Sequence, residues 1–427
     1  MSETTATAVF HRYESQVRSY CRSFPVVFER AAGHHLWDTA GRRYVDLLCA
    51  AGSLNYGHNP PPVLERVAAY LTGGGPIQTL DLHTTAKAEF LHRFSTEILA
   101  ERGMRDHVLQ FPGPAGTLAV EAALKLARKA TGRTNVVAFS GGFHGASLGS
   151  LAVTSSRLLR GAAGIALPGT TILPYDEGDR SADAIEAALR PGGRIGPPAA
   201  FVLETVQGEG GLSVASRAWL ARIRQIADDV GALVIVDDVQ AGCGRTGTFF
   251  SFEHVPGLDP DIVCLSKSLS GLGLPMAMLV VRRDRDVLGP GEHNGTFRGQ
   301  NLAFVGATAA LDYWAAAGFE AHVARLAVAI RETVRDVVGK LPEGTAVPAG
   351  RGAMSGLRFT EAGVASSVRD ELFRAAIIAE TSGDGRVLKL LPPLTMSLAD
   401  WAGVAGRLTD VVVDAVLRTP LAAGVTA

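Results

Sequence analysis

Seven short apolar runs mark the middle of the chain, and polar or glycine-rich residues follow most of them. The runs are rich in Val, Ile and Leu at consecutive positions, which is typical of strands covered by helices on both faces. We therefore predict buried strands at 108–111, 135–139, 170–174, 199–204, 232–237, 261–265 and 276–281.

Amphipathic helices are predicted between these runs. Residues 117–131 and 216–230 carry apolar side chains at helical spacing. The second helix has Ser216 as its N-cap and Gly231 as its C-terminal stop. The alternation of strands and helices predicts an α/β fold with an open, mostly parallel central sheet.

The two ends of the chain have a different pattern. Residues 26–49 predict a meander with a turn at 38–41, and helices from about residue 321 onward surround strand-like segments at 355–359 and 387–391. We expect both ends to form one smaller α+β domain beside the large one. The predicted division is 1–75 and 321–427 for the small domain and 76–320 for the large domain.

Composition excludes several classes of partner. The chain of 427 residues is 47% hydrophobic and has a formal net charge of −1, so no overall field attracts nucleic acid or a membrane surface. No apolar stretch has the length of a membrane span, and the first residues lack the pattern of a signal peptide. The four cysteines show neither metal-ligand nor disulfide spacing. We therefore expect a cytoplasmic protein without a metal site.

Two of the predicted strands end in an acid and an amine, at the edge where open α/β sheets bind ligands. Asp237 and Asp238 follow an apolar run, so one carboxylate must point inward and needs a partner. Lys267 follows another run between small residues, and among only six lysines it is the best placed to lose its proton by desolvation. Taken singly, a turn-capping aspartate and a solvated lysine are the alternative interpretations.

Two further strand ends suit a phosphate and a flat ring. Gly116 and Thr117 lie where a glycine-rich turn enters a helix, and the backbone N–H groups there can bind an anion. Phe143 lies in a glycine-flanked loop and can stack on a planar group, with His144 beside it. An ordinary loop and a small hydrophobic plug are the alternatives.

A fifth strand end carries two acids. Glu204 and Glu209 flank a flexible glycine-rich loop and can gate a charged substrate, or they are surface charges. Together the five strand ends suit a phosphate, a flat ring, a cationic ring nitrogen and a carbonyl. These are the features of pyridoxal 5′-phosphate (PLP).

Three strings of residues resemble the class III (ω-amino acid) aminotransferases of PLP fold type I. They are E-T-V-Q-G-E-G-G at 204–211, V-D-D-V-Q-A-G-C-G-R-T-G at 236–247 and L-S-K-S-L-S-G at 265–271. The resemblance extends over nearly the whole chain. Within the family, G-S-L-N-Y-G-H-N at 52–59 and K-L-L-P-P-L-T at 389–395 are most similar to the diaminobutyrate–2-oxoglutarate aminotransferases.

This resemblance implies a role for each candidate around the cofactor. Lys267 would hold PLP covalently through its aldehyde and move a proton during the reaction. Asp237 would pair with the ring nitrogen, and Gln240 would bind the ring hydroxyl oxygen. Gly116 and Thr117 would hold the phosphate, Phe143 would stack on the ring with His144 beside it, and Thr296 would reach the phosphate held by a neighbouring subunit.

The same resemblance implies substrate contacts and partners. Glu209 would move to admit either an ω-amine or a dicarboxylate. Lys389 stands where relatives carry the arginine partner of the gating carboxylate, and a lysine lacks the bidentate fork of arginine. The cofactor contact of Thr296 implies a homodimer with its active site at the interface.

The implied activity is transfer of an amino group from L-glutamate to L-aspartate 4-semialdehyde. The products are L-2,4-diaminobutyrate and 2-oxoglutarate, as in ectoine biosynthesis. The alternatives are a class III enzyme for another ω-amine, such as ornithine or GABA, and a PLP-fold domain without catalytic activity. Expected partners are small amino and oxo acids and a second copy of the chain, with neither nucleic acid nor a membrane.

Overall fold

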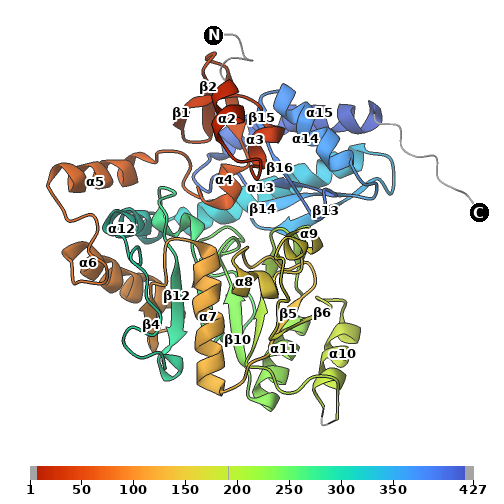
Figure 1. Ribbon diagram of the computed structural model, residues 1–427. Coiled ribbons are helices and arrows are strands. Elements are labelled where there is room, and N and C mark those ends of the chain that lie inside the picture. Colours follow the sequence, from red (N-terminus) through yellow and green to blue (C-terminus); the bar gives the residue numbers. More distant parts are fainter. Residues whose placement is uncertain (1–6, 191, 419–427) are drawn as a thin grey trace, which may run out of the picture.

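The computed structural model describes residues 7–190 and 192–418, and a seven-stranded sheet forms the core of its lower half in the view of Figure 1. All seven predicted strands belong to this sheet. In sheet order they are β4 (His107–Gln110), β12 (Met278–Arg282), β11 (Ile262–Leu265), β10 (Leu233–Asp237), β7 (Ala200–Leu203), β5 (Val136–Phe139) and β6 (Thr170–Leu173).

The sheet is mostly parallel, as the alternating pattern predicts. The pairs β11–β10, β10–β7, β7–β5 and β5–β6 are parallel, whereas β12 runs antiparallel to both β11 and β4. The carboxyl ends of the other six strands therefore lie at one edge of the sheet. That edge is where ligands bind in open α/β folds.

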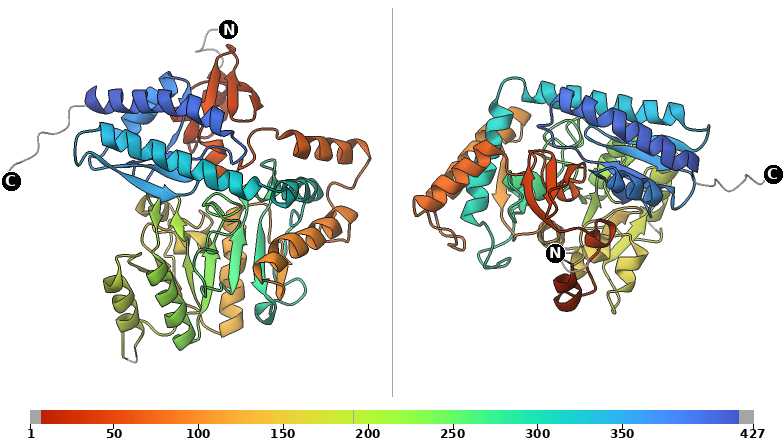
Figure 2. Two further views of the ribbon diagram at one scale, coloured as in Figure 1. Left: turned by 180° about the vertical axis from the view of Figure 1, so that it is seen from behind. Right: turned by 90° about the horizontal axis from the view of Figure 1, so that it is seen from above.

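Helices cover both faces of this sheet, which explains its unbroken apolar runs (Figures 1 and 2). Alternate strand residues face opposite sides: Val136 packs in one buried cluster with α7 (Gly116–Thr131), and Val137 packs in another with α11 (Arg217–Val230). Ser216 caps α11 by accepting from the Trp219 N–H at 3.2 Å, and Gly231 ends it in the left-handed conformation, as predicted.

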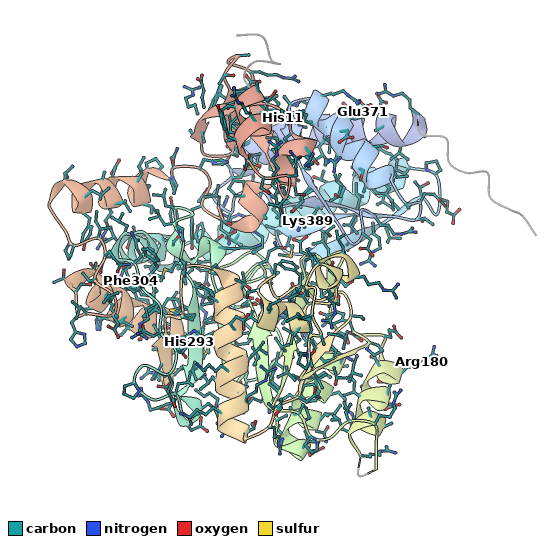
Figure 3. The ribbon with its side chains drawn as sticks, in the orientation of Figure 1. His11, Arg180, His293, Phe304, Glu371 and Lys389 are labelled. Carbon is teal, nitrogen blue, oxygen red and sulfur yellow. The ribbon has the colours of Figure 1, made fainter. Side chains whose placement is uncertain are left out.

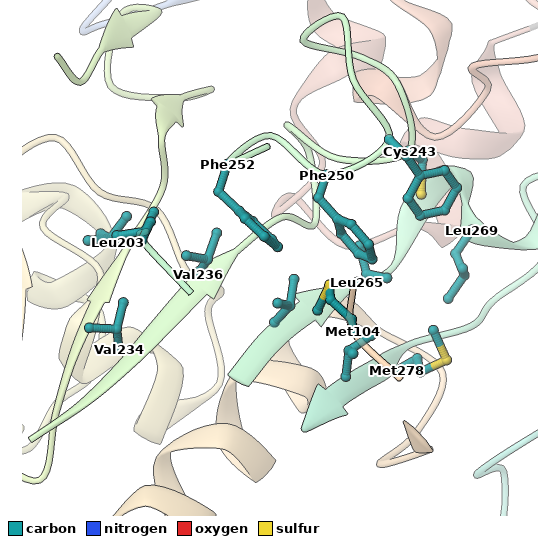
Figure 4. Close-up of a cluster of buried hydrophobic side chains, with 14 of the residues drawn as sticks. Met104, Leu203, Val234, Val236, Cys243, Phe250, Phe252, Leu265, Leu269 and Met278 are labelled. Carbon is teal, nitrogen blue, oxygen red and sulfur yellow. The ribbon is translucent and has the colours of Figure 1, made fainter. Parts of the chain in front are cut away.

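Buried aromatic residues extend the core beyond the strand ends. Figure 4 shows Val234 and Val236 on β10 with Phe250 and Phe252 of the following loop packed near them. Phe250 has no exposed surface, and burial of such a side chain contributes roughly 1.5–3 kcal/mol. The loops that carry the candidate site residues thus start from a rigid edge.

Two four-stranded sheets lie at the other end of the molecule (Figure 1). The first contains β1 (Phe28–Ala32), β2 (His35–Asp38), β3 (Arg43–Asp46) and β15 (Ile377–Ile378), and the second contains β13 (Ala346–Arg351), β14 (Met354–Phe359), β17 (Val387–Leu390) and β16 (Glu380–Ser382). Val45 of β3 pairs with Ile377 of β15, so the two ends of the chain share one sheet. The precise domain bounds stay a prediction.

The remaining elements connect and cover these sheets. A short β-hairpin, β8 (Val206–Gln207) and β9 (Ser213–Val214), follows β7. The other helices are α2 (Ala8–Tyr13), α3 (Tyr20–Ser23), α4 (Cys49–Gly52), α5 (Pro61–Thr72), α6 (Thr85–Arg93), η1 (Phe94–Leu99), η2 (Ala100–Arg102), α8 (Leu148–Val153), α9 (Arg157–Gly161), α10 (Asp179–Leu189), η3 (Lys267–Ser270), η4 (Arg283–Arg285), α12 (Asn301–Ala315), α13 (Phe319–Lys340), α14 (Val364–Arg374) and α15 (Leu398–Arg418).

A helix that crosses a membrane must be both long enough and apolar enough. In residues 7–190 and 192–418, no helix on its own has both properties, and only α12 and α13 taken together meet them, with a bend of 82° between the two helices.

Candidate active site

The candidate acid and amine follow adjacent parallel strands. Asp237 is the last residue of β10 and pairs in register with Cys264 of β11, and Lys267 lies three residues beyond Cys264. The fold therefore brings these two candidates to the same edge of the sheet.

Lys267 occupies a strained backbone position. Its φ is +49°, in the left-handed region that a residue with a side chain rarely adopts. Its Nζ donates to the Ala51 carbonyl at 2.8 Å, and Ala51 itself has a φ of +55°. Burial, followed by the nearby Lys389 cation, lowers the pKa of Lys267 to about 8. The amine is thus held in place and easily deprotonated.

Asp237 is buried and fixed by two donors. His144 Nδ1 lies 2.7 Å from Asp237 Oδ2, and the Val239 N–H donates to Oδ1 at 3.1 Å. Burial alone would lower the pKa of His144, but the hydrogen bond and charge of Asp237 raise it above its ordinary value. His144 therefore acts through Asp237, which it orients as a proton donor.

The start of α7 forms a cradle for an anion. The helix begins at Gly116, and no side chain of the described residues caps its N-terminus at Ala115. A Cβ atom at Gly116 would lie 2.9 Å from Val239 Cγ1, so only glycine leaves this approach open. Thr117 Oγ1 lies 2.6 Å from Ser147 Oγ, which fixes its side chain. The uncapped N–H groups at this helix N-terminus, where the helix dipole is positive, fit the phosphate of PLP.

The loop after β5 is tied to the loop after β7 by one buried carboxylate. The Phe143 N–H donates to Glu204 Oε2 at 3.0 Å, and the Gly208 N–H donates to Oε1 at 3.1 Å. Burial raises the pKa of Glu204 to about 7. The side chain of Phe143 is 36% exposed. Glu204 therefore positions the candidate stacking residue and the loop that leads to Glu209.

Lys389 lies at the centre of a charged cluster between the two parts of the molecule (Figure 3). Its Nζ lies 2.7 Å from Glu209 Oε1 and 2.9 Å from Glu380 Oε2, and its side chain has no exposed surface. Burial alone would lower the pKa of Lys389, but the two carboxylates raise it. Burial alone would raise the pKa of Glu209, but Lys389 lowers it. Lys389 and Glu209 are therefore held in their charged forms.

Gln240 links this cluster to the acid and the amine. Its Nε2 donates to the Ala51 carbonyl at 3.1 Å and to Glu209 Oε1 at 3.4 Å. Lys267 donates to the same Ala51 carbonyl. A Cβ at Gly208 would overlap Gln240 Oε1, which explains the glycine there. The structure thus brings Gln240, Glu209, Lys267 and Lys389 together.

Sequence reasoning missed Glu380, Tyr20 and Ala51. Glu380 is the cross-strand neighbour of Lys389 in the β16–β17 pair, and opposite charges in such pairs attract. The glycine-rich turn between the two strands could have indicated this pairing. Tyr20 donates from α3 to Glu380 Oε1 at 2.8 Å, a contact across 360 positions that local patterns do not encode.

Thr296 lies on an exposed loop between β12 and α12. Its carbonyl accepts a hydrogen bond from Gln78 Nε2 at 2.9 Å. Thr296 also lines a shallow hollow together with residues 80 and 81. The role expected for it concerns a neighbouring subunit and stays a prediction.

Comparison with known proteins agrees with this geometry. The family model described as Aminotransferase class-III matches residues 17–412. The diaminobutyrate–2-oxoglutarate transaminase of Halalkalibacterium halodurans is 48% identical over 93% of each chain, and that of Vibrio cholerae is 48% identical over 92% of this chain and 97% of its own. The ornithine aminotransferase of Toxoplasma gondii superposes with a TM-score of 0.85 at 26% identity, over 98% of this chain and 95% of its own.

The chain belongs to the class III aminotransferase family. It is a PLP-dependent aminotransferase of fold type I, as predicted from the strand-end residues and the three motif strings. The cradle at Gly116, the desolvated amine of Lys267 and the fixed carboxylate of Asp237 fit the phosphate, aldehyde and ring nitrogen of PLP.

The lowered pKa of Lys267 predicts how PLP capture depends on pH. A neutral amine is the nucleophile, and a pKa of about 8 leaves about a tenth of Lys267 neutral at pH 7, against about 0.03% for an ordinary lysine. We expect the capture rate of the cofactor-free protein, followed by visible absorption, to rise with pH and level off above about 8. A rate still rising tenfold per pH unit from 8 to 9.5 would contradict the lowered pKa.

Proposed function

We propose that this enzyme transfers an amino group between L-glutamate and L-aspartate 4-semialdehyde, forming L-2,4-diaminobutyrate and 2-oxoglutarate. The supporting observation is 48% identity, over nine-tenths of the chain, to two relatives from different bacteria. Both relatives are named for this activity. The ornithine-type alternative has less support, because the ornithine aminotransferase above is 26% identical.

Each half-reaction needs a proton carried between carbon and nitrogen at the bound substrate. When bound, PLP supplies an aldehyde for the amino group and a ring that accepts electrons. Lys267 Nζ is the base and acid for the proton, and its low pKa suits it to both tasks near neutral pH. Asp237, oriented by His144, would pair with the ring nitrogen of the bound cofactor.

Two chemically different donors must use one site. Glutamate brings a second carboxylate, whereas diaminobutyrate brings a second ammonium group. With Glu209 on Lys389, the cation is neutralised and the site accepts the diamine. With Glu209 turned away, Lys389 is free to bind a carboxylate of glutamate, and Glu380 keeps the lysine protonated and in position.

Replacing Glu209 by glutamine therefore favours the dicarboxylate. The neutral amide no longer competes for Lys389, and a charge-assisted hydrogen bond is worth about 1.5–3 kcal/mol. We expect the ratio of kcat/KM for glutamate to kcat/KM for diaminobutyrate to rise by about tenfold or more in single half-reactions. Glu177→Gln, a loop carboxylate outside this cluster, is the control. An unchanged ratio would show that Glu209 does not discriminate between the donors.

A donor panel tests the proposed substrate directly. Purified enzyme is given 2-oxoglutarate with diaminobutyrate, ornithine, GABA or lysine, and glutamate formation is measured. We expect kcat/KM for diaminobutyrate to exceed that for each other donor by at least about tenfold, because one extra methylene alone discriminates by roughly 10–200-fold. A higher value for ornithine or GABA would support the alternative function.

We further propose that the enzyme works as a cytoplasmic homodimer with the active site at the subunit interface, and that its diamine supplies ectoine synthesis. Support for a dimer comes from apolar side chains left exposed near the predicted cofactor loops. They are Leu80, Leu82, Phe143, Leu148 and Phe297. Sedimentation at several concentrations, with Phe297→Asp as the variant, tests the assembly.

A further inference from the structure

We propose that a groove beside the Glu209 loop binds a small organic polyanion, a molecule with an apolar body and at least two anionic groups. The groove encloses about 540 Å³ between α13, β13, β14 and the β8–β9 hairpin. It is separate from the cluster around Lys267, and the site described above does not use it.

Four arginines line this groove without any acid among the lining residues. Arg331 and Arg335 come from α13, Arg351 ends β13, and Arg358 lies on β14. None of the four forms an ion pair with a carboxylate of residues 7–190 or 192–418. Four cations therefore share one concave surface in a protein whose net charge is only −1.

The arginines differ in whether their guanidinium groups already form hydrogen bonds within the protein. Arg358 Nη2 donates to the Gly211 carbonyl at 2.7 Å, and Arg351 Nη2 donates to the Ser251 carbonyl at 2.6 Å. The side chains of Arg331 and Arg335, by contrast, form no hydrogen bond within the described residues, and the two residues lie one helical turn apart. Their two guanidinium groups are free to bind separate anionic groups in the bidentate manner.

An apolar floor completes the groove. Val347 is 55% exposed and Val214 is 40% exposed, and both line the groove together with Leu212 and Pro348. An inorganic ion would leave this surface in contact with water, whereas an organic body would cover it. Burial also lowers the pKa of Arg351 to about 10, and a bound anion would favour its charged form.

Calorimetry on the PLP-loaded enzyme tests this proposal with three probes. ADP combines charge with a flat apolar body, pyrophosphate carries charge alone, and adenosine carries the body alone. The cofactor occupies the phosphate cradle at Gly116, so the titration reports the groove. We expect ADP to bind most tightly, with an affinity that falls as salt is raised.

Variants locate the binding. Arg331→Gln with Arg335→Gln removes the two unpaired cations from an exposed helix face, and we expect it to weaken ADP binding by at least about tenfold. Arg325→Gln on the same helix lies outside the groove and is the control, with unchanged affinity. The proposal is overturned if the double variant binds ADP as the wild type does, or if ADP binds no more tightly than adenosine. Equal affinities for ADP and pyrophosphate would overturn the claim that the ligand has an apolar body.

Discussion

Replacing Lys267 by alanine is expected to lower kcat by about four orders of magnitude or more. On the proposed mechanism the variant loses the base that moves the proton, a contribution of about 10²–10⁴-fold, and also the covalent hold on the cofactor. The loss is measured as the steady-state rate with glutamate as donor. Lys340→Ala is the matched control, because Lys340 is a surface lysine that pairs with the exposed Asp336.

The same variant is expected to remain folded. In the described part of the chain, Lys267 Nζ donates to the Ala51 carbonyl and forms no ion pair, so its removal leaves no carboxylate without its partner. Alanine at a φ of +49° retains a backbone strain of about 1–3 kcal/mol that the wild type already carries. Circular dichroism and urea unfolding check this point. Near wild-type turnover in the folded variant would refute the assigned mechanism.

Replacing Lys389 by methionine is expected to lower the free energy of unfolding by about 3–5 kcal/mol. The change leaves Glu209 and Glu380 facing each other without the cation between them, and breaking one side of a buried ion pair has an effect of this size. Urea denaturation measures it. Lys340→Met removes an exposed ion pair and is expected to change stability by less than about 1 kcal/mol.

A second substitution separates charge from packing. Adding Glu380→Gln to Lys389→Met removes the carboxylate that is 7% exposed, and we expect part of the lost stability to return. If Lys389→Met alone changes the free energy of unfolding by less than about 1 kcal/mol, the cluster is not an electrostatic unit.

Apolar patterning predicted the strands well, because a strand buried on both faces must be apolar throughout. All seven runs form strands of one sheet, but the pattern did not predict the direction of each strand. The run at 276–281 forms the antiparallel strand β12, and its composition resembles that of the six strands that are parallel to one another. Direction depends on how the chain returns after Lys267, which hydrophobic spacing does not encode.

The site divides in the same way. The position of Asp237 and Lys267 at one edge of the sheet was predictable, because both lie at the carboxyl ends of buried parallel strands. Lys389 was found only through resemblance, since it lies inside a strand and its neighbours are leucines. Its second partner, Glu380, lies opposite it in a short hairpin whose glycine-rich turn is a usable signal. The Tyr20 hydroxyl, by contrast, comes from an element that reaches the cluster only in the folded protein.

Borohydride reduction followed by peptide mapping tests the central claim most directly. Reduction fixes the cofactor to the amine that holds it, and mass spectrometry of the digest identifies that residue. The account predicts one labelled peptide, which contains Lys267. A label on Lys389 or on any other lysine, or no label in protein that is active, would contradict it.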